Sequence, residues 1–347
     1  MEKDFEEHYY VVTEEVKLNI STAARELPPY ITIQFAWYSF IFTLGVIGNL
    51  YITLTVTLRK EMSSATNYFI FNLAISDLGI LLISLPAYII RDYFSWSFGK
   101  IACQIIIPMN DVSFSVSICT ITVITLERYR AIVAPFKPRL KARGGKLTIA
   151  LIWVLTYLSV GFPMAFYMEL TKVDDRLICL PKWPSNIVFK ILTCFFISLI
   201  IIPLCITAVA YIIMIKTMRK QSKRLREARE RRHSAGIGST VSLKHVQERH
   251  RHDYNAKLVK MLIIIVVVFW ICMLPLSILA FVVEFFVIDP RKPVVDGLFT
   301  LSIAVFFSNS AFNPVAIYIM SSDLRKGINT LLFFGRKRCK KNGIPHI

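Results

Sequence analysis

Hydrophobic and polar residues occur in long blocks along this chain, and seven of the hydrophobic blocks could each cross a bilayer. A transmembrane helix needs about 20 mostly apolar residues. The chain meets that need at residues 31–58, 68–90, 101–134, 147–168, 187–216, 258–288 and 294–320. The pattern predicts an all-α membrane protein with a bundle of seven transmembrane helices over residues 31–320.

Polar segments surround this bundle. Residues 1–30 form a polar, acidic tail without the apolar core of a cleaved signal peptide, so we expect the first span to act as the insertion signal. Residues 217–257 are basic, and we expect helical extensions around a disordered centre there. Residues 321–334 place apolar side chains at near-helical spacing, which predicts a short amphipathic eighth helix before a basic tail at 335–347.

The distribution of Lys and Arg predicts the orientation in the membrane. Of the 41 basic residues, 30 lie in the segments on one side of the spans, and the net charge of that side is +23 against −3 on the other. The positive-inside rule places the basic side in the cytoplasm and the N-terminal tail outside the cell. The overall charge of +18 therefore indicates anionic membrane lipid and cytoplasmic protein partners, and argues against nucleic acid.

This orientation also assigns covalent modifications. Cys103 and Cys179 are the two cysteines that we expect to face the oxidising exterior, so we pair them in a disulfide. Asn19 lies in an Asn-Ile-Ser glycosylation sequon on the same side. Cys339 lies in a basic cytoplasmic cluster, where a palmitoyl chain would complete a two-signal membrane anchor.

Charged residues inside the spans are the first candidates for function, because an Asp at mid-helix costs about 3 kcal/mol. We interpret Asp77 in the second span as an ionised carboxylate that holds a small cation or moves a proton. The alternative is a protonated carboxyl in a polar network. Asn110 and Asp111, near the outer end of the third span, indicate an aqueous cavity, with pairing to a neighbouring helix as the alternative.

The inner end of the third span carries Glu127, Arg128 and Tyr129, followed by Ala131-Ile132-Val133 and Pro135. This sequence resembles the signature of rhodopsin-like G-protein-coupled receptors. The resemblance covers residues 31–334, and each of the seven spans contains residues that match the family. The further matching residues are Asn49; Leu73, Ala74 and Asp77; Cys103 and Cys179; Trp153 and Pro163; Pro203 and Tyr211; Phe269, Cys272 and Pro275; Asn313 and Pro314.

The resemblance implies a receptor in the plasma membrane that is not an enzyme and needs no cofactor. Its partners would be an extracellular ligand and a heterotrimeric G-protein, with arrestins and receptor kinases besides. It also implies an allosteric sodium site formed by Asp77, Ser117, Asn309, Ser310 and Asn313.

The resemblance further implies a switch at the inner end of the bundle. On activation Arg128 would lose its contact with Glu127 and would then contact the G-protein. Signals from the ligand would reach the sixth helix through Ile118, Pro203 and Phe269. The switch is completed by Tyr129, Tyr211, Asn313 and Pro314.

Three positions depart from the pattern of the family. Met273 stands where a Trp usually forms the floor of the ligand pocket, so we expect a looser switch. Ile317 occupies a usual Tyr position and Tyr318 follows about 100° round the helix, which puts the contact between this Tyr and Tyr211 in doubt. Asn255 replaces the acid that in some members clamps the Arg of the switch.

The class of ligand follows from the residues expected at the outer end. Phe307 stands where opsins carry the retinal Lys, and Asn110 where amine receptors carry an Asp, which argues against both classes. The remaining resemblance is to neuropeptide receptors, through Ser84-Leu85-Pro86, Trp96-Ser97-Phe98-Gly99 and residues 113–117. We assign ligand contacts to Asn110, Asp111, Phe114, Tyr88, Glu284, Met273 and Phe307.

Acidic residues at this end suggest the charge of the peptide. Glu284 matches an acid that holds the Arg of peptides ending in Arg-aromatic-amide. Together with Asp111, Glu169, Asp174 and Asp175 it would create a negative field that steers a cationic peptide. The alternative is that these are solvated loop charges.

Other functions fit parts of the sequence. A transporter or channel could use Asp77, but internal repeats and a charged path through the spans are missing. A non-coupling accessory receptor would fit Met273 and Ile317, and a receptor for a non-peptide ligand would fit the same spans. A membrane enzyme is disfavoured because no nucleophile–base pair or metal-ligand set is evident.

Overall fold

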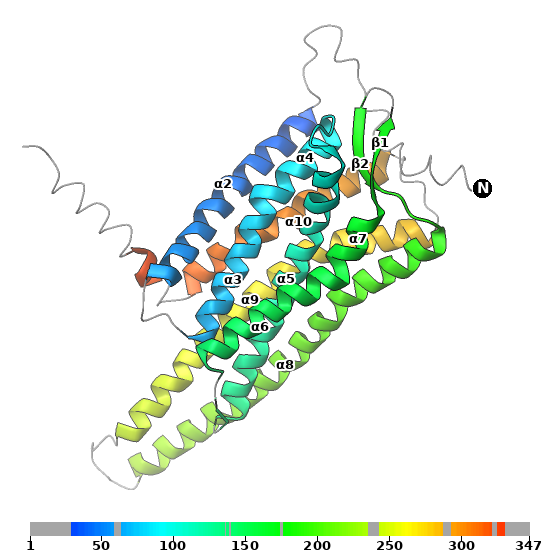
Figure 1. Ribbon diagram of the computed structural model, residues 1–347. Helices are drawn as coiled ribbons and strands as arrows, with labels where there is room; N and C mark the ends of the chain where they lie inside the picture. The colour runs from blue at the N-terminus through cyan, green and yellow to red at the C-terminus, as the bar shows by residue number, and fades with distance from the viewer. Residues whose placement is uncertain are drawn as a thin grey trace, which may run out of the picture.

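The computed structural model describes residues 29–58, 64–135, 137–138, 140–173, 176–234, 243–286, 293–320 and 325–329. It contains seven spans that are long and apolar enough to cross a membrane, which confirms the predicted bundle (Figure 1). In chain order the spans are α2 (Pro29–Leu58); α3 (Ala65–Gly79), η3 (Ile80–Ser84) and α4 (Leu85–Tyr93); α5 (Gly99–Val133); α6 (Ala142–Thr156), η4 (Tyr157–Gly161) and α7 (Phe162–Tyr167); α8 (Asn186–Ser234); α9 (Leu243–Phe285); and α10 (Pro293–Met320).

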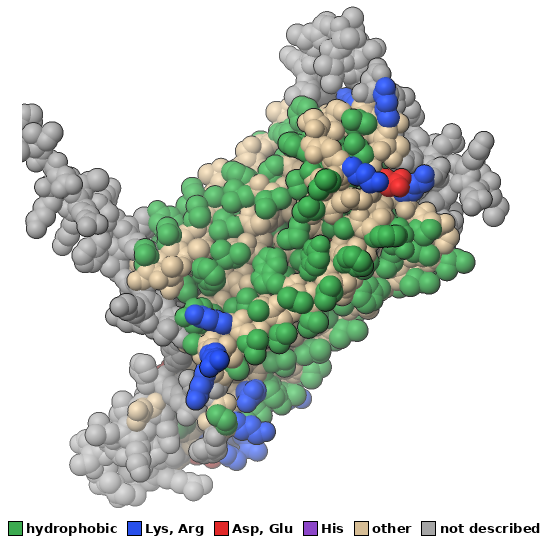
Figure 2. Space-filling model, viewed as in Figure 1, with side chains coloured by type: hydrophobic (Ala, Val, Ile, Leu, Met, Phe, Trp, Pro, Cys, Tyr) green, Lys and Arg blue, Asp and Glu red, His purple; other side chains and the backbone are tan. Residues whose placement is uncertain are grey.

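The surface of the bundle is apolar around its middle. In Figure 2 hydrophobic side chains cover the central part of the visible face, and the Lys and Arg side chains gather towards its two ends. Many large hydrophobic side chains on the outside of the helices are more than a third exposed, such as Leu54, Leu155 and Ile202. In a bilayer these side chains contact lipid, whose tails are as apolar as they are.

The second and fourth spans each contain a π-helical turn directly before a proline. The backbone N–H of Leu85 donates to the carbonyl of Ile80 just before Pro86, and the N–H of Phe162 donates to Tyr157 before Pro163. A proline removes one backbone donor and crowds the preceding turn, and a wider turn relieves that crowding. The helix distortion at Pro86 therefore takes the form of a π turn.

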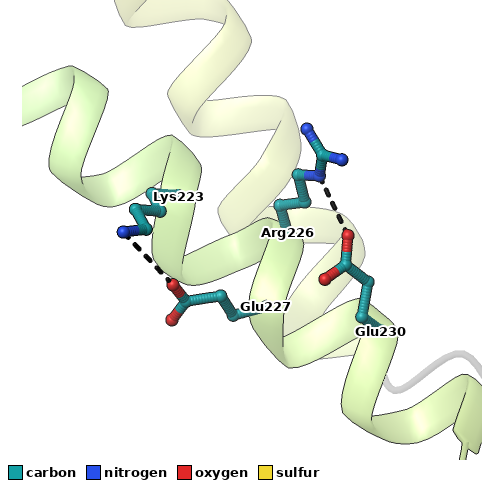
Figure 3. Close-up of polar contacts among 4 residues, drawn as sticks. All are labelled: Lys223, Arg226, Glu227 and Glu230. Atoms are coloured by element: carbon teal, nitrogen blue, oxygen red, sulfur yellow. Dashed lines mark hydrogen bonds and ion pairs between the residues drawn. The ribbon is translucent and has the colours of Figure 1, made fainter.

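Helices α8 and α9 continue beyond the membrane as long extensions, which lie at the lower left of Figure 1. On α8 the Lys223–Glu227 and Arg226–Glu230 pairs have N–O distances of 3.9 and 2.9 Å (Figure 3). Pairs at this spacing each support an exposed helix by about 0.2–0.5 kcal/mol. The predicted helical extensions of the basic loop are therefore present, and its centre at 235–242 lies outside the described residues.

A β-hairpin, which was not predicted from the sequence, accompanies the predicted helical bundle. Strands β1 (Met168–Val173) and β2 (Arg176–Pro181) pair antiparallel at one end of the bundle. Cys179 on β2 forms the predicted disulfide with Cys103 on α5. We call this end the outer end and the end near Arg128 the inner end, following the charge-based orientation.

The loop before α5 packs beneath this disulfide. Trp96 is 1% exposed and belongs to the same apolar cluster as both cysteines. Its Nε1 donates to the carbonyl of Gly99 at 3.0 Å, and its backbone N–H donates to Leu177 of β2 at 2.7 Å. Gly99 has φ +78°, a conformation that favours glycine. Trp96 and Gly99 therefore make this loop a packed part of the outer end.

Helices α2 and α10 approach each other closely. A Cβ atom on Gly48 would lie 2.7 Å from the Pro314 side chain, so only a glycine fits there without a shift. Next to it, Asn49 is 1% exposed and its Nδ2 donates to the carbonyl of Ser310 at 2.9 Å. Asn49 therefore faces the bundle, as expected for an amide in the hydrocarbon region.

Several predicted features fall outside the described residues. These are the tail with Asn19, the loop residues Asp174 and Asp175, Cys339, and most of the proposed eighth helix. Residues 325–329 are helical and Ile328 is buried. The eighth helix as a whole therefore stays a prediction.

Candidate functional site

The centre of the bundle holds a buried carboxylate. Asp77 on α3 is 0% exposed, and its Oδ2 accepts a hydrogen bond from Nδ2 of Asn313 on α10 at 2.9 Å. Ser117 on α5 is equally buried, and its hydroxyl contacts that of Ser76 at 2.9 Å. The residues of the predicted sodium site thus lie on three helices, α3, α5 and α10, and Asp77 contacts Asn313 directly.

Several oxygen atoms in this cluster have no hydrogen-bond partner among the described residues. They are Oδ1 of Asp77, Oδ1 of Asn309, Oγ of Ser310 and Oδ1 of Asn313. Buried polar atoms in hydrocarbon are costly when unsatisfied. One carboxylate and three neutral oxygens form a donor set that fits a hard monovalent cation with its water.

A second polar network links α3, α5 and α6, and the sequence analysis missed most of it. Nε1 of Trp153 donates to Oδ1 of Asn72 at 2.8 Å, and Nδ2 of Asn72 donates to Oγ1 of Thr120 at 2.8 Å. Thr120 in turn donates to the carbonyl of Val116. This series of hydrogen bonds satisfies the side chain of Asn72 and fixes the middle parts of the three spans relative to one another.

Below the cluster, two members of the proposed relay line a single small cavity. Ile118 on α5 and Phe269 on α9 both face it, together with Leu204 of α8. Pro203, the third proposed member, immediately precedes Leu204. Met273 lies one helical turn above Phe269 and is 2% exposed, so it is part of the packed core.

At the inner end, the structure gives Arg128 a partner that the sequence did not suggest. A guanidinium nitrogen of Arg128 donates to the hydroxyl of Thr66 on α3. Oε1 of Glu127 accepts from the backbone N–H of Leu140 at 3.4 Å. Arg128 is therefore tied to the second span, and Glu127 to the loop before the fourth.

Tyr211 of the proposed switch and Tyr318, the displaced Tyr of the seventh span, have different partners. The hydroxyl of Tyr211 on α8 contacts Oγ1 of Thr125 on α5 at 2.9 Å. Tyr318 on α10 is 39% exposed and donates to Oδ1 of Asn329 at 3.2 Å, whereas Ile317 is 1% exposed. The rotation expected from the shifted Tyr is thus visible in this state.

Aromatic rings fill the outer half of the bundle. The ring of Phe307 on α10 lies 5.5 Å from that of Tyr88 on α4 and 6.2 Å from that of Tyr38 on α2. Phe114 on α5 packs against Phe306 with ring centroids 3.8 Å apart. Three of the proposed ligand contacts therefore lie in one aromatic layer, to which Tyr38 and Phe306 add.

A basic side chain at the outer end was also missed. Arg91 on α4 forms an ion pair with Asp92 at 2.9 Å, and its guanidinium carbon lies 5.3 Å from the centre of the Tyr88 ring. The positive charge of Arg91 also interacts electrostatically with the carboxylate of Asp111 on α5. The mouth therefore contains a cation among the acids and is not uniformly negative.

The remaining ligand candidates are placed as follows. Nδ2 of Asn110 donates to Oδ1 of Asp111 at 3.3 Å, and Oδ1 of Asn110 is buried without a partner among the described atoms. Glu169 is exposed on β1. Glu284 lies in α9, but its side chain is not among those described.

Comparison with known proteins gives a match to a family model and similarity to receptors that include the following three. Residues 48–318 match the family model of the 7 transmembrane receptor (rhodopsin family). Neuropeptide FF receptor 2 of Rattus norvegicus is 26% identical over 330 residues, which cover 90% of this chain and 75% of the relative. The neuromedin-K receptors of Mus musculus and Rattus norvegicus are each 29% identical over 302 residues, which cover 84% of this chain. The chain spans only 61% of the length of each neuromedin-K receptor.

The Thr125–Tyr211 contact can be measured as a coupling energy. We expect Thr125→Val and Tyr211→Phe each to lower the free energy of unfolding by about 1 kcal/mol, because each removes one side of a hydrogen bond. In the double variant the loss should be smaller than the sum of the two single losses, and the difference is a coupling energy of about 0.5–1.5 kcal/mol. The measurement is unfolding of purified protein in detergent.

Thr122 supplies the control for this cycle, because its hydroxyl donates to the carbonyl of Ile118 on its own helix. Thr122→Val combined with Tyr211→Phe should give additive losses. Additive losses in the Thr125 cycle itself would contradict the expectation.

Proposed function

This chain belongs to the rhodopsin family of seven-transmembrane receptors, and we propose that it binds an extracellular peptide and activates a heterotrimeric G-protein. The observation that carries the proposal is the family match over residues 48–318, which includes Tyr88, Phe114 and Phe307 of the aromatic layer and the inner switch. The relatives are named as receptors for neuropeptide FF and neuromedin K. We extend the peptide class from those proteins to this one.

The proposed mechanism is a shift between two states of the bundle. A ligand in the outer pocket can favour the active state only by as much as it binds that state more tightly. Opening the inner end requires rearrangement of contacts between helices, above all Arg128 with Thr66 and Thr125 with Tyr211. Freed from Thr66, the guanidinium of Arg128 would be available to the G-protein. No catalysis on a substrate is involved.

The charges at the mouth support a ligand with a cationic group. Asp111 offers a carboxylate below the mouth, and Arg91 lies close enough to act on it. A cationic group of the ligand would therefore have to compete with Arg91 for Asp111. Glu284 is proposed as a second acidic contact, because its position in α9 matches that of the acid in receptors for Arg-aromatic-amide peptides.

We also propose that the central cluster binds a sodium ion in the inactive state. The ligands would be Asp77 with Ser117, Asn309, Ser310 and Asn313. Unpartnered oxygens on all of these residues except Ser117 support the assignment. The ion would supply the positive charge that makes an ionised Asp77 tolerable in hydrocarbon. The protein's own part is to hold these oxygens on three separate helices, so that a movement of α10 disperses them.

The remaining proposals concern the surroundings of the receptor. We place it in the plasma membrane with the N-terminal tail outside, glycosylated at Asn19 and palmitoylated at Cys339. Arrestins and receptor kinases are proposed as further cytoplasmic partners. These assignments rest on the charge distribution and on the family, with the basic inner side facing anionic lipid.

Coupling is tested by nucleotide exchange. We expect an agonist, found by screening amidated and free-acid neuropeptides, to accelerate exchange on a purified G-protein by receptor in lipid nanodiscs. Arg128→Ala should reduce this acceleration at least about tenfold while the agonist still binds, because the guanidinium acts only at the inner end. Arg143→Ala, at an exposed basic residue of the inner end, is the control.

Agonist-dependent ion flux without nucleotide exchange would instead support a channel or transporter. Agonist binding without exchange on any G-protein class would support an accessory receptor.

The ligand charge is tested at Asp111 and Arg91. For a peptide agonist with a C-terminal Arg-aromatic-amide, Asp111→Asn should raise the concentration needed for half-maximal response about tenfold, since a charged hydrogen bond is worth about 1.5–3 kcal/mol. Arg91→Gln should lower that concentration, because a competing cation is removed. If both variants leave potency unchanged, the cationic-ligand proposal is wrong. Asp253→Asn, an exposed acid on the inner extension of α9, should have no effect.

The sodium proposal is tested by ion replacement. In wild-type receptor, replacing choline with sodium should lower agonist affinity about fivefold or more, within the usual range of allosteric coupling. Asp77→Asn should abolish this dependence, because the neutral amide of nearly equal size cannot balance the ion. Asp296→Asn, the same change near the start of α10, should retain it. Sodium dependence that survives Asp77→Asn would exclude this site.

A further inference from the structure

A groove opens on the lipid-facing surface of the bundle between α5 and α8, in the half of the membrane nearer the inner end. Seven residues line it, and apart from Cys205 and the Tyr129 ring they are aliphatic: Leu126, Tyr129, Cys205, Ile206, Val209, Ala210 and Ile213. Leu126, Ile206 and Val209 are 41%, 42% and 56% exposed. Because both helices are membrane spans at this level, the groove faces the hydrocarbon of the bilayer.

Two basic side chains stand at the inner end of this groove. Arg130 follows Leu126 by four residues on α5, and Lys216 follows Ile213 by three on α8, so each continues a lining stripe by one helical turn. Both are exposed. Arg130 is oriented by a hydrogen bond from Nη2 to the carbonyl of Pro138 at 3.3 Å.

We propose that this groove binds one anionic phospholipid of the inner leaflet. An acyl chain would lie along the apolar lining, and the phosphate would contact Arg130 and Lys216. The inner leaflet is the anionic one, and basic groups near the membrane surface attract its headgroups. A second copy of the receptor fits less well, because its own Arg130 and Lys216 would meet like charges at the same level.

The position of the groove gives the lipid a consequence for the bundle. Leu126 and Ala210 in the lining are the chain neighbours of Thr125 and Tyr211, whose hydroxyls join α5 to α8 at 2.9 Å. An acyl chain in the groove would therefore pack over the seam where these helices meet. The proposal does not depend on the ligand or on the G-protein, since lipid binding is measured directly.

The experiment is native mass spectrometry of the purified full chain with added phosphatidylserine or phosphatidylcholine of the same acyl chains. We expect the first lipid to bind with a preference for phosphatidylserine. Arg130→Gln and Lys216→Gln should each reduce that preference about fivefold, and together they should bring it close to the value for phosphatidylcholine. Lys260→Gln, at an exposed basic residue of α9, should leave the preference unchanged.

The apolar part of the groove is tested by filling it. Val209→Trp should weaken binding of both lipids several-fold. Ile212→Trp, exposed on the same helix about one turn nearer the inner end but outside the lining, should not. Photoactivatable phosphatidylserine should label peptides from α5 and α8 in wild-type protein and lose that label in Val209→Trp.

Three outcomes would overturn the proposal. The first is equal binding of the two lipids by wild-type protein. The second is a preference that survives the double charge variant, which remains measurable even if Val209→Trp fails to fold. The third is loss of a dimer in Val209→Trp with lipid binding unchanged, which would make the groove an interface between copies.

Discussion

The architecture depends on how the bundle accommodates Asp77 inside the membrane. A carboxylate at mid-helix costs about 3 kcal/mol unless neighbouring helices satisfy it. Here Asn313 of α10 donates to it, and Asn49 of α2 binds the carbonyl of Ser310 one turn earlier on α10. Gly48 lets α2 and α10 come close enough for these bonds to form. The two polar residues Asp77 and Asn49 thus explain why the second and the first span each pack against the seventh.

Much of the fold could be predicted from the sequence because the bilayer imposes simple rules. Length and hydropathy locate the spans, and the excess of Lys and Arg on one side orients them. The orientation in turn identifies Cys103 and Cys179 as partners, and the disulfide is present. The β-hairpin was missed because two six-residue strands outside the membrane carry no comparable constraint. The π turns before Pro86 and Pro163 were missed because a proline predicts a distortion but does not define its form.

The candidate site was predictable where an unusual residue stands in an apolar span, as with Asp77 and Asn49. It was not predictable where ordinary residues meet across helices. Thr66 and Thr125 resemble the many Thr residues that bond to their own helix, and only the three-dimensional arrangement brings them to Arg128 and Tyr211. Arg91 lies just beyond the end of the second span predicted from the sequence, and nothing in its local sequence indicates its partners on α4 and α5. Contacts between distant segments carry no local signature.

Helix α9 is continuous from Leu243 to Phe285, so a change of tilt at one level moves its whole inner part. Phe269 marks the level at which this helix packs against the relay cavity, and about 39 Å of helix extends from there to its inner tip at about 1.5 Å per residue. A tilt of only ~6° about that level would swing the tip by about 4 Å. Subtle repacking near the pocket floor can therefore be geometrically magnified into a displacement large enough for a cytoplasmic protein to detect.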